Sequence, residues 1–214
     1  MTDAVDWQAL AREFVTLLVV IDPIGTLPVF YFATAGAPRA LHWRVAVRAV
    51  LVAGAVLMLF LVAGQLVLEA IGLRLGSFQI AGGIVLFLFA LTMIFGDAKP
   101  EREIEEAGRD HMAGAVFPLA MPSIASPGAM LAVVILTDNH RHSIPDQAVT
   151  ALMLVAVLAI TLALLLVASW LKRFIGTTGA SVISRVMGII LATVAVDAVL
   201  GGLAAVGALS IAGG

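Results

Sequence analysis

The chain has 214 residues, of which 62% are hydrophobic and 12% are charged, with a formal net charge of −2 and no Cys. Soluble globular domains carry about 45–50% apolar and about 25% charged residues, so this composition excludes an ordinary soluble domain. The absence of Cys excludes disulfides, thiolate metal sites and Cys nucleophiles. A slightly negative chain without a basic stripe argues against a nucleic-acid partner. The composition predicts an integral membrane protein, with the lipid bilayer as its main partner.

Six apolar stretches are long enough to cross a bilayer. A hydrocarbon core about 30 Å thick needs a helix of roughly 20 apolar residues, and unbroken apolar runs exclude a β-barrel. We therefore expect an all-α membrane protein with six transmembrane helices, forming a single membrane domain over residues 1–214. The predicted spans are 14–35, 49–68, 75–96, 113–137, 148–170 and 186–209. The longest connector, 97–112, is rich in both signs of charge and is predicted to be a solvated loop.

The basic residues predict an orientation in a plasma membrane. Loops that carry an excess of Lys and Arg face the cytoplasm. Nine of the twelve Lys and Arg residues lie in the loops after the first, third and fifth spans, which places these loops inside and both termini outside. The nine are Arg39, Arg44, Arg48, Lys99, Arg102, Arg109, Lys172, Arg173 and Arg185.

The chain matches itself when it is shifted by 104 or 105 residues. Pro23 then falls on Pro127, and the offset persists through all three spans of each half, as the pairs Gly83 and Gly188, Ala90 and Ala195, and Gly96 and Gly201 illustrate. This pattern predicts a repeat over about residues 10–100 and a second over about 112–209. Because each unit has an odd number of spans, the units would be inverted, an arrangement of secondary transporters. A duplicated scaffold without transport is the alternative.

The first span of each repeat is interrupted by proline. Asp22-Pro23-Ile24-Gly25-Thr26 interrupts span 14–35, and Ser126-Pro127-Gly128 interrupts span 113–137. Proline has no N–H and cannot continue the hydrogen bonding of a helix. A simple kink would explain one proline. Asp-Pro and Ser-Pro, however, are each a capping residue followed by proline, which is typical of the start of a helix.

Each interruption is therefore predicted to begin a new half-helix inside the membrane. Helix N-termini carry partial positive charge and free N–H groups, which attract anionic or polar ligands. We expect a substrate site formed by Asp22, Pro23, Gly25, Thr26, Ser126, Pro127, Gly128 and Gln79, with Asp22 and Ser126 as caps and with the glycines allowing the backbone to approach a solute.

These segments resemble the MarC family of bacterial inner-membrane proteins over nearly the whole chain. Asp22-Pro-Ile-Gly-Thr-Leu-Pro-Val-Phe is similar to its Asn-Pro-x-Gly-x-x-Pro-x-Phe segment. Ser77-Phe-Gln-Ile-Ala-Gly-Gly-Ile, Pro118-Leu-Ala-Met-Pro and Ser126-Pro-Gly-Ala are similar to its third-helix and fourth-helix segments. The resemblance implies a six-helix protein of the bacterial inner membrane, distantly similar to LysE-type amino-acid exporters.

Two positions depart from the family pattern. Asp22 stands where the family usually has Asn, and Ser126 where it usually has Gly. An ionised Asp22 would offset the helix dipole, whereas a protonated one would cap as Asn does. This difference opens the options of proton coupling or cation binding at Asp22.

Asp197 is the second acidic residue well inside a span. A carboxylate at the centre of a span costs about 2.5–3.5 kcal/mol, so Asp197 is expected to face the protein interior or a cavity. We predict Asp22 and Asp197 as a proton relay, with a protonated Asp bonded to a backbone carbonyl as the alternative. Gln79, Gln65 and Thr26 are weaker candidates that also suit helix–helix hydrogen bonds. Asp138 is expected to be solvated, and His140-Arg141-His142 gives only a weak indication of a metal site.

The sequence predicts a secondary transporter or exporter of a small polar solute, driven by the proton gradient. A passive channel and a membrane scaffold or regulatory protein without solute flux are the alternatives. No phosphate loop, nucleotide fingerprint or metalloprotease motif is present, and Ser126 has no His within a span to activate it, so neither an enzyme, a cofactor nor a metal is expected. Faces of small residues allow a homo-oligomer without requiring one.

Overall fold

The computed structural model describes residues 7–34, 36–95, 110–138 and 143–208. Most of the predicted loop 97–112 lies outside the described residues, as does His140-Arg141-His142. The described residues form helices and no strand, which confirms the all-α class. In chain order the elements are α1 (Trp7–Ile21), α2 (Thr26–Ala33), α3 (Arg39–Ala70), α4 (Leu75–Phe95), α6 (His111–Gly114), η1 (Ala115–Ile124), α7 (Pro127–Leu136) and α8 (Ile144–Ala205).

Four stretches of the described residues are long and apolar enough to cross a membrane. They are Arg39–Ala70, Leu75–Phe95, Ile144–Ala168 and Arg185–Ala205. The pair His111–Ile124 and Pro127–Leu136, bent by 54°, makes a fifth if it is counted as one span. The predicted span 14–35 is divided into α1, of 15 residues, and α2, of 8 residues. Six full spans are therefore not confirmed, because the interruption at Asp22-Pro23 leaves two pieces that are each short.

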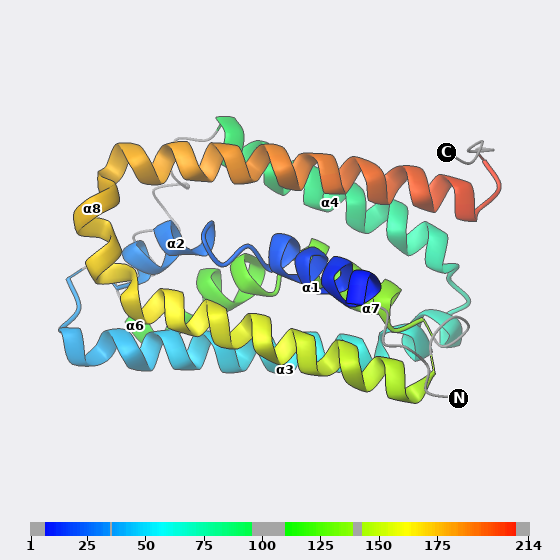
Figure 1. The fold of residues 1–214 in the computed structure, drawn as a ribbon, viewed down its shortest axis with the longest axis horizontal. Helices are drawn as coiled ribbons and strands as arrows, with labels where there is room; N and C mark the ends of the chain where they lie inside the picture. Colours follow the sequence, from blue (N-terminus) through cyan, green and yellow to red (C-terminus); the bar gives the residue numbers. More distant parts are fainter. Residues whose placement is uncertain (1–6, 35, 96–109, 139–142, 209–214) are drawn as a thin grey trace.

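The last two predicted spans belong to one helix. We expected a connector between spans 148–170 and 186–209, but α8 is helical over 62 residues. The intervening sequence contains no proline, so nothing removes a backbone donor there. Figure 1 shows that α8 bends and returns along the molecule, so its first arm (Ile144–Ala168) and second arm (Arg185–Ala205) lie on opposite sides.

The interrupted segments lie in the middle of the bundle. In Figure 1, α3 and the first arm of α8 run along one side, α4 and the second arm along the other, and α1, α2 and α7 lie between them. The turn between α2 and α3, the end of α4 and the bend of α8 lie toward one end. The end of α3, the start of α4 and the end of α7 lie at the other end. This alternation agrees with the predicted order of the loops.

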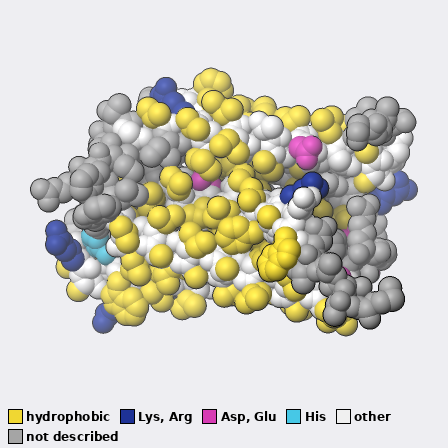
Figure 2. Space-filling view, viewed as in Figure 1, with side chains coloured by type: hydrophobic (Ala, Val, Ile, Leu, Met, Phe, Trp, Pro, Cys, Tyr) yellow, Lys and Arg dark blue, Asp and Glu magenta, His cyan; other side chains and the backbone are white. Residues whose placement is uncertain are grey.

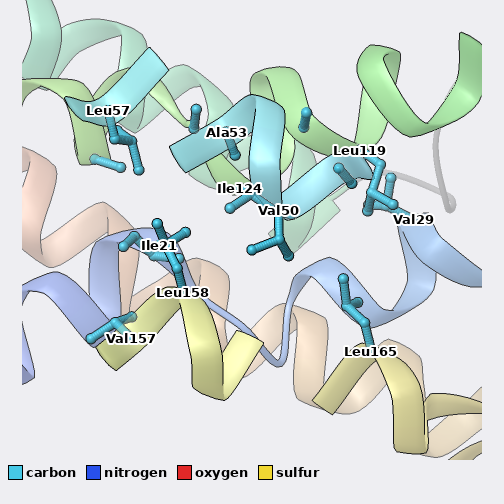
Figure 3. Packing of buried hydrophobic residues seen from close by; sticks show 14 of the residues in the cluster. Ile21, Val29, Val50, Ala53, Leu57, Leu119, Ile124, Val157, Leu158 and Leu165 are labelled. Carbon is cyan, nitrogen blue, oxygen red and sulfur yellow. The ribbon is translucent and has the colours of Figure 1, made fainter. Parts of the chain in front are cut away.

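The main core packs the interrupted segments against α3 and the first arm of α8. Figure 3 shows Ile21, the last residue of α1, next to Leu158, while Ile124, the last residue of η1, lies near Val50 of α3. Both isoleucines are fully buried. Each interruption of the helices therefore begins immediately after a side chain that is fixed in the core.

The second arm of α8 packs closely on α4. A Cβ atom built on a glycine at this contact would lie about 3 Å or less from a backbone carbonyl oxygen of the opposite helix, so larger side chains are excluded. We call this contact the α4–α8 seam. The close approaches are Gly76 to Gly202 (3.0 Å), Gly83 to Ala195 (2.9 Å) and Gly188 to Ala90 (3.0 Å). Small residues that let backbones approach are a common basis of helix association in membranes.

Replacing Gly202 with Ala is expected to destabilise the seam. The added Cβ would lie 2.7 Å from the Gly76 carbonyl oxygen, and overpacking of this kind costs about 1–3 kcal/mol. The measurement is thermal unfolding in detergent. Gly201→Ala is the matched control, since its Cβ would meet only the flexible end of Gln79 at 3.0 Å, and it gains the same helix propensity. Equal melting temperatures for the two variants would contradict the packing described here.

Candidate substrate site at the helix interruptions

The first interruption is a turn capped by Asp22. The Asp22 backbone has a φ of 48°, a left-handed conformation that Asp tolerates better than most residues. Its carbonyl accepts from the Thr26 N–H (3.1 Å), and its Oδ1 accepts from the Gly25 N–H (2.9 Å). Asp22 therefore caps the turn, as predicted. The new helix begins at Thr26 rather than at Pro23, because the Leu27 N–H donates to the Ile24 carbonyl (3.1 Å) and tightens the turn.

The second interruption confirms the predicted helix start. Ser126 is the N-cap of α7, Pro127 occupies the first turn, and the Ala129 N–H donates to the Ser126 Oγ (3.0 Å). The segment before it is less regular than we expected. Phe117 and Met121 have extended backbones within η1. Each precedes a proline, and proline disfavours the helical conformation of the residue before it.

One hydrogen bond joins the two interruptions. The Ser126 hydroxyl donates to the Val20 carbonyl in the last turn of α1, at 3.0 Å across 106 residues. A hydroxyl can donate and accept at once, so Ser126 both caps α7 and anchors it to α1. The structure thus brings together the two segments that the sequence singled out.

Most of the predicted polar residues here are buried. Asp22, Thr26 and Ser126 are 5%, 1% and 1% exposed, and Ser123 of η1, which the sequence analysis did not select, is 5% exposed. The Thr26 hydroxyl donates to the Pro23 carbonyl (2.7 Å). The interruptions therefore place one carboxyl group and several hydroxyl groups inside an otherwise apolar bundle.

The two glycines touch protein groups. A Cβ on Gly25 would overlap the Asp22 carboxyl group, and a Cβ on Gly128 would lie 2.6 Å from Leu86 Cδ2 of α4. Gly25 therefore gives room to the capping carboxyl group, while Gly128 lets α7 approach α4. Whether either backbone also contacts a solute stays a prediction.

Gln79 and Asp197 lie on the other side of the bundle. Gln79 belongs to α4 and lies beside Gly201 of α8. Asp197 belongs to the second arm of α8 and is exposed, so the expectation that it faces the interior is wrong. Ala195 and Leu191 occupy the buried face of this arm, and the helical period turns Asp197 away from them. Within the described residues no hydrogen bond or ion pair joins Asp22 to Asp197.

The prediction that Asp138 is solvated is wrong. It is 6% exposed rather than solvated, and the Gln65 Nε2 donates to its Oδ1 (3.0 Å) and to Glu69 Oε1 (3.1 Å). The repeat offers a signal that could have found it. Asp138 lies 104 positions after Thr34, which is also buried.

Histidines hold the far end of α2, a role that the sequence analysis did not anticipate. The His111 Nδ1 lies 3.0 Å from the Ala33 carbonyl oxygen, at the last residue of α2. His42 lies 3.2 Å from the Ala37 carbonyl oxygen through its Nε2, and its ring packs edge-on against Phe30. These contacts connect α2 to α6 and α3.

The fold defines an integral membrane protein of helices, two of whose segments are interrupted at the centre of the bundle. The description "MarC family integral membrane protein" matches residues 7–206. The chain belongs to the MarC family, which confirms the resemblance seen in its motifs.

Relatives occur in archaea and bacteria. A UPF0056 membrane protein of Methanocaldococcus jannaschii is 33% identical over 200 residues, which cover 92% of this chain and 97% of that one. The UPF0056 inner membrane protein YhgN of Escherichia coli is 32% identical over 191 residues, 88% of this chain and 93% of its own. YvbG of Bacillus subtilis is 29% identical over 198 residues, with 91% and 93% covered. No solved structure matches the chain.

Removing the Ser126 hydroxyl is expected to destabilise the protein. Ser126→Ala deletes a helix cap, which costs about 0.5–2 kcal/mol, and also leaves the Val20 carbonyl without its donor. Ser126→Thr retains the hydroxyl and should keep most of the stability. Thermal or denaturant unfolding in detergent measures both. Identical stability of Ser126→Ala and the parent chain would show that this hydrogen bond contributes nothing.

Proposed function

We propose that this protein is a secondary transporter of a small polar solute in the plasma membrane, without enzymatic activity. The main support is the hydrogen bond from Ser126 to Val20, which joins the two interrupted segments close to the buried carboxyl group of Asp22. Discontinuous helices near the middle of a membrane commonly form the binding sites of secondary transporters. The proposed solute site comprises Asp22, Pro23, Gly25, Thr26, Ser126, Pro127 and Gly128, with Gln79 as a more distant contributor.

The α4–α8 seam supports an inverted repeat. Under the 105-residue shift, Gly83 corresponds to Gly188 and Ala90 to Ala195. The contact of Gly83 with Ala195 then corresponds to the contact of Gly188 with Ala90, and both occur. Such reciprocal contacts are the property of a two-fold interface. A pseudo-two-fold axis between α4 and the second arm of α8 would allow the two halves to rock and expose the site alternately.

Asp22 is the group we assign to proton coupling. It is buried at the centre of the bundle, and its carboxyl group can cap the turn in either protonation state. Asp197, on the exposed face of α8, is proposed as a secondary relay that water or a second copy of the chain would have to reach. With the basic loops in the cytoplasm, both termini would lie outside the cytoplasm. The distant likeness to LysE-type proteins favours export.

A thermal-shift screen tests the proposal first. Purified protein is heated with amino acids, small peptides, organic acids, sugars and cations at pH 5.5 and 7.5. A ligand that binds the folded state raises the melting temperature by mass action. We expect at least one class of solute to do so. We also expect Asp22→Asn, which keeps an oxygen for the Gly25 N–H, to retain folding but lose the pH dependence of that shift. Asp138→Asn, which removes a buried carboxylate outside the proposed site, is the matched control.

Transport is then measured in proteoliposomes with the solute that the screen identifies. Saturable uptake that depends on a pH gradient supports the transporter, whereas conductance without saturation would favour a channel. No shift across the panel and no flux would point to a scaffold. Unchanged proton-coupled transport in Asp22→Asn would remove Asp22 as the coupling group.

A further inference from the structure

The C-terminal end of α1 lacks the usual donors for its last carbonyl groups. In a continuous helix, the carbonyls of Val19, Val20 and Ile21 would accept from residues 23, 24 and 25. Residue 23 is proline and has no N–H. The Gly25 N–H donates instead to the Asp22 carboxyl group. Only the Val20 carbonyl has a replacement donor among the described residues, which is the Ser126 hydroxyl.

This end of α1 is therefore rich in negative charge. The C-terminus of a helix carries about half a negative charge, and the Asp22 carboxyl group, 5% exposed, lies directly after it. The buried polar and charged side chains of the described part of the chain are Asp, Thr and Ser only. Within that part, no Lys, Arg or His is buried that would neutralise Asp22, and a buried carboxylate without a counter-charge is costly.

We propose that the C-terminal end of α1 is a binding site for a monovalent cation, with Na⁺ as its probe. The ligands are the Asp22 carboxylate and the carbonyl oxygens of Val19 and Ile21. Carboxylate and carbonyl oxygens suit hard cations, and unwound backbone with half-helix C-termini coordinates Na⁺ in transporters of other folds. A single carboxylate matches a single positive charge.

The described residues are less suited to a divalent metal ion. They contain no group of three or more His, Asp or Glu side chains that could hold a metal ion. The site therefore depends on backbone oxygens. The inference rests on the proposed transport function and names a coupling ion for it: the cation occupies Asp22 in the state in which the proton does not.

The test measures the melting temperature of the purified full chain as Na⁺ replaces N-methyl-D-glucamine at constant ionic strength. Specific binding raises the melting temperature with a saturable dependence on Na⁺. Li⁺ and K⁺ titrations report selectivity by size. We expect Asp22→Asn to abolish the Na⁺ effect, whereas Asp138→Asn, which removes a carboxylate elsewhere, keeps it.

A second variant tests a backbone ligand and leaves the Asp22 carboxylate in place. Pro23→Ala supplies an N–H that can donate to the Val19 carbonyl, and so withdraws one ligand while Asp22 remains. We expect its half-saturating Na⁺ concentration to rise about tenfold, which corresponds to about 1.4 kcal/mol of binding free energy. An unchanged value in Pro23→Ala together with an unchanged value in Asp22→Asn would overturn the site.

The outcomes separate this inference from the proposed function. A solute-dependent shift without any Na⁺ effect would overturn the cation site and leave the transporter standing. Equal melting temperatures in Na⁺, Li⁺, K⁺ and N-methyl-D-glucamine at the same ionic strength would also overturn it, because a specific site distinguishes a small metal cation from a bulky organic one. A saturable Na⁺ effect without a solute shift would support the site and count against the solute transporter.

Discussion

The hydrogen bond from the Ser126 hydroxyl to the Val20 carbonyl joins the two interruptions on which the rest of the architecture depends. Prolines at positions 23 and 127 remove backbone donors inside an apolar bundle, where an unsatisfied polar group is expensive. The Ser126 hydroxyl donates to a neighbouring carbonyl of α1, that of Val20, while it also caps α7. Because Ile21 and Ile124 anchor both segments in the core, the polar groups are held at fixed positions rather than dispersed.

The hydrophobic surface and the α4–α8 seam both suit a helical bundle that lies in a membrane. Figure 2 shows hydrophobic side chains over much of one face of the molecule, as expected where lipid replaces water. The α4–α8 seam then excludes larger side chains through glycine contacts. Between these outer helices, the polar side chains of the interruptions, Asp22, Thr26 and Ser126, are buried, and irregular backbone is tolerated at membrane depth where it packs against protein.

The two intramembrane carboxyl groups occupy different environments. Asp22 is enclosed by its own turn and by the end of α1, whereas Asp197 lies on an exposed face of α8. A buried carboxylate beside a helix C-terminus favours a positively charged occupant, whether a proton or a metal cation.

The sequence by itself determined the all-helical class, the positions of both interruptions and the Ser126 cap, because proline and capping residues act on their immediate neighbours. It placed Asp22 correctly as a cap but began the following helix too early. Only the tertiary structure decided that α8 is continuous, that Asp138 is buried and that Asp197 is exposed. The face that a helix turns toward its neighbours is set by packing between distant segments. In a membrane protein, apolar side chains cover both the buried and the lipid-facing sides, so hydrophobic patterning alone does not distinguish them.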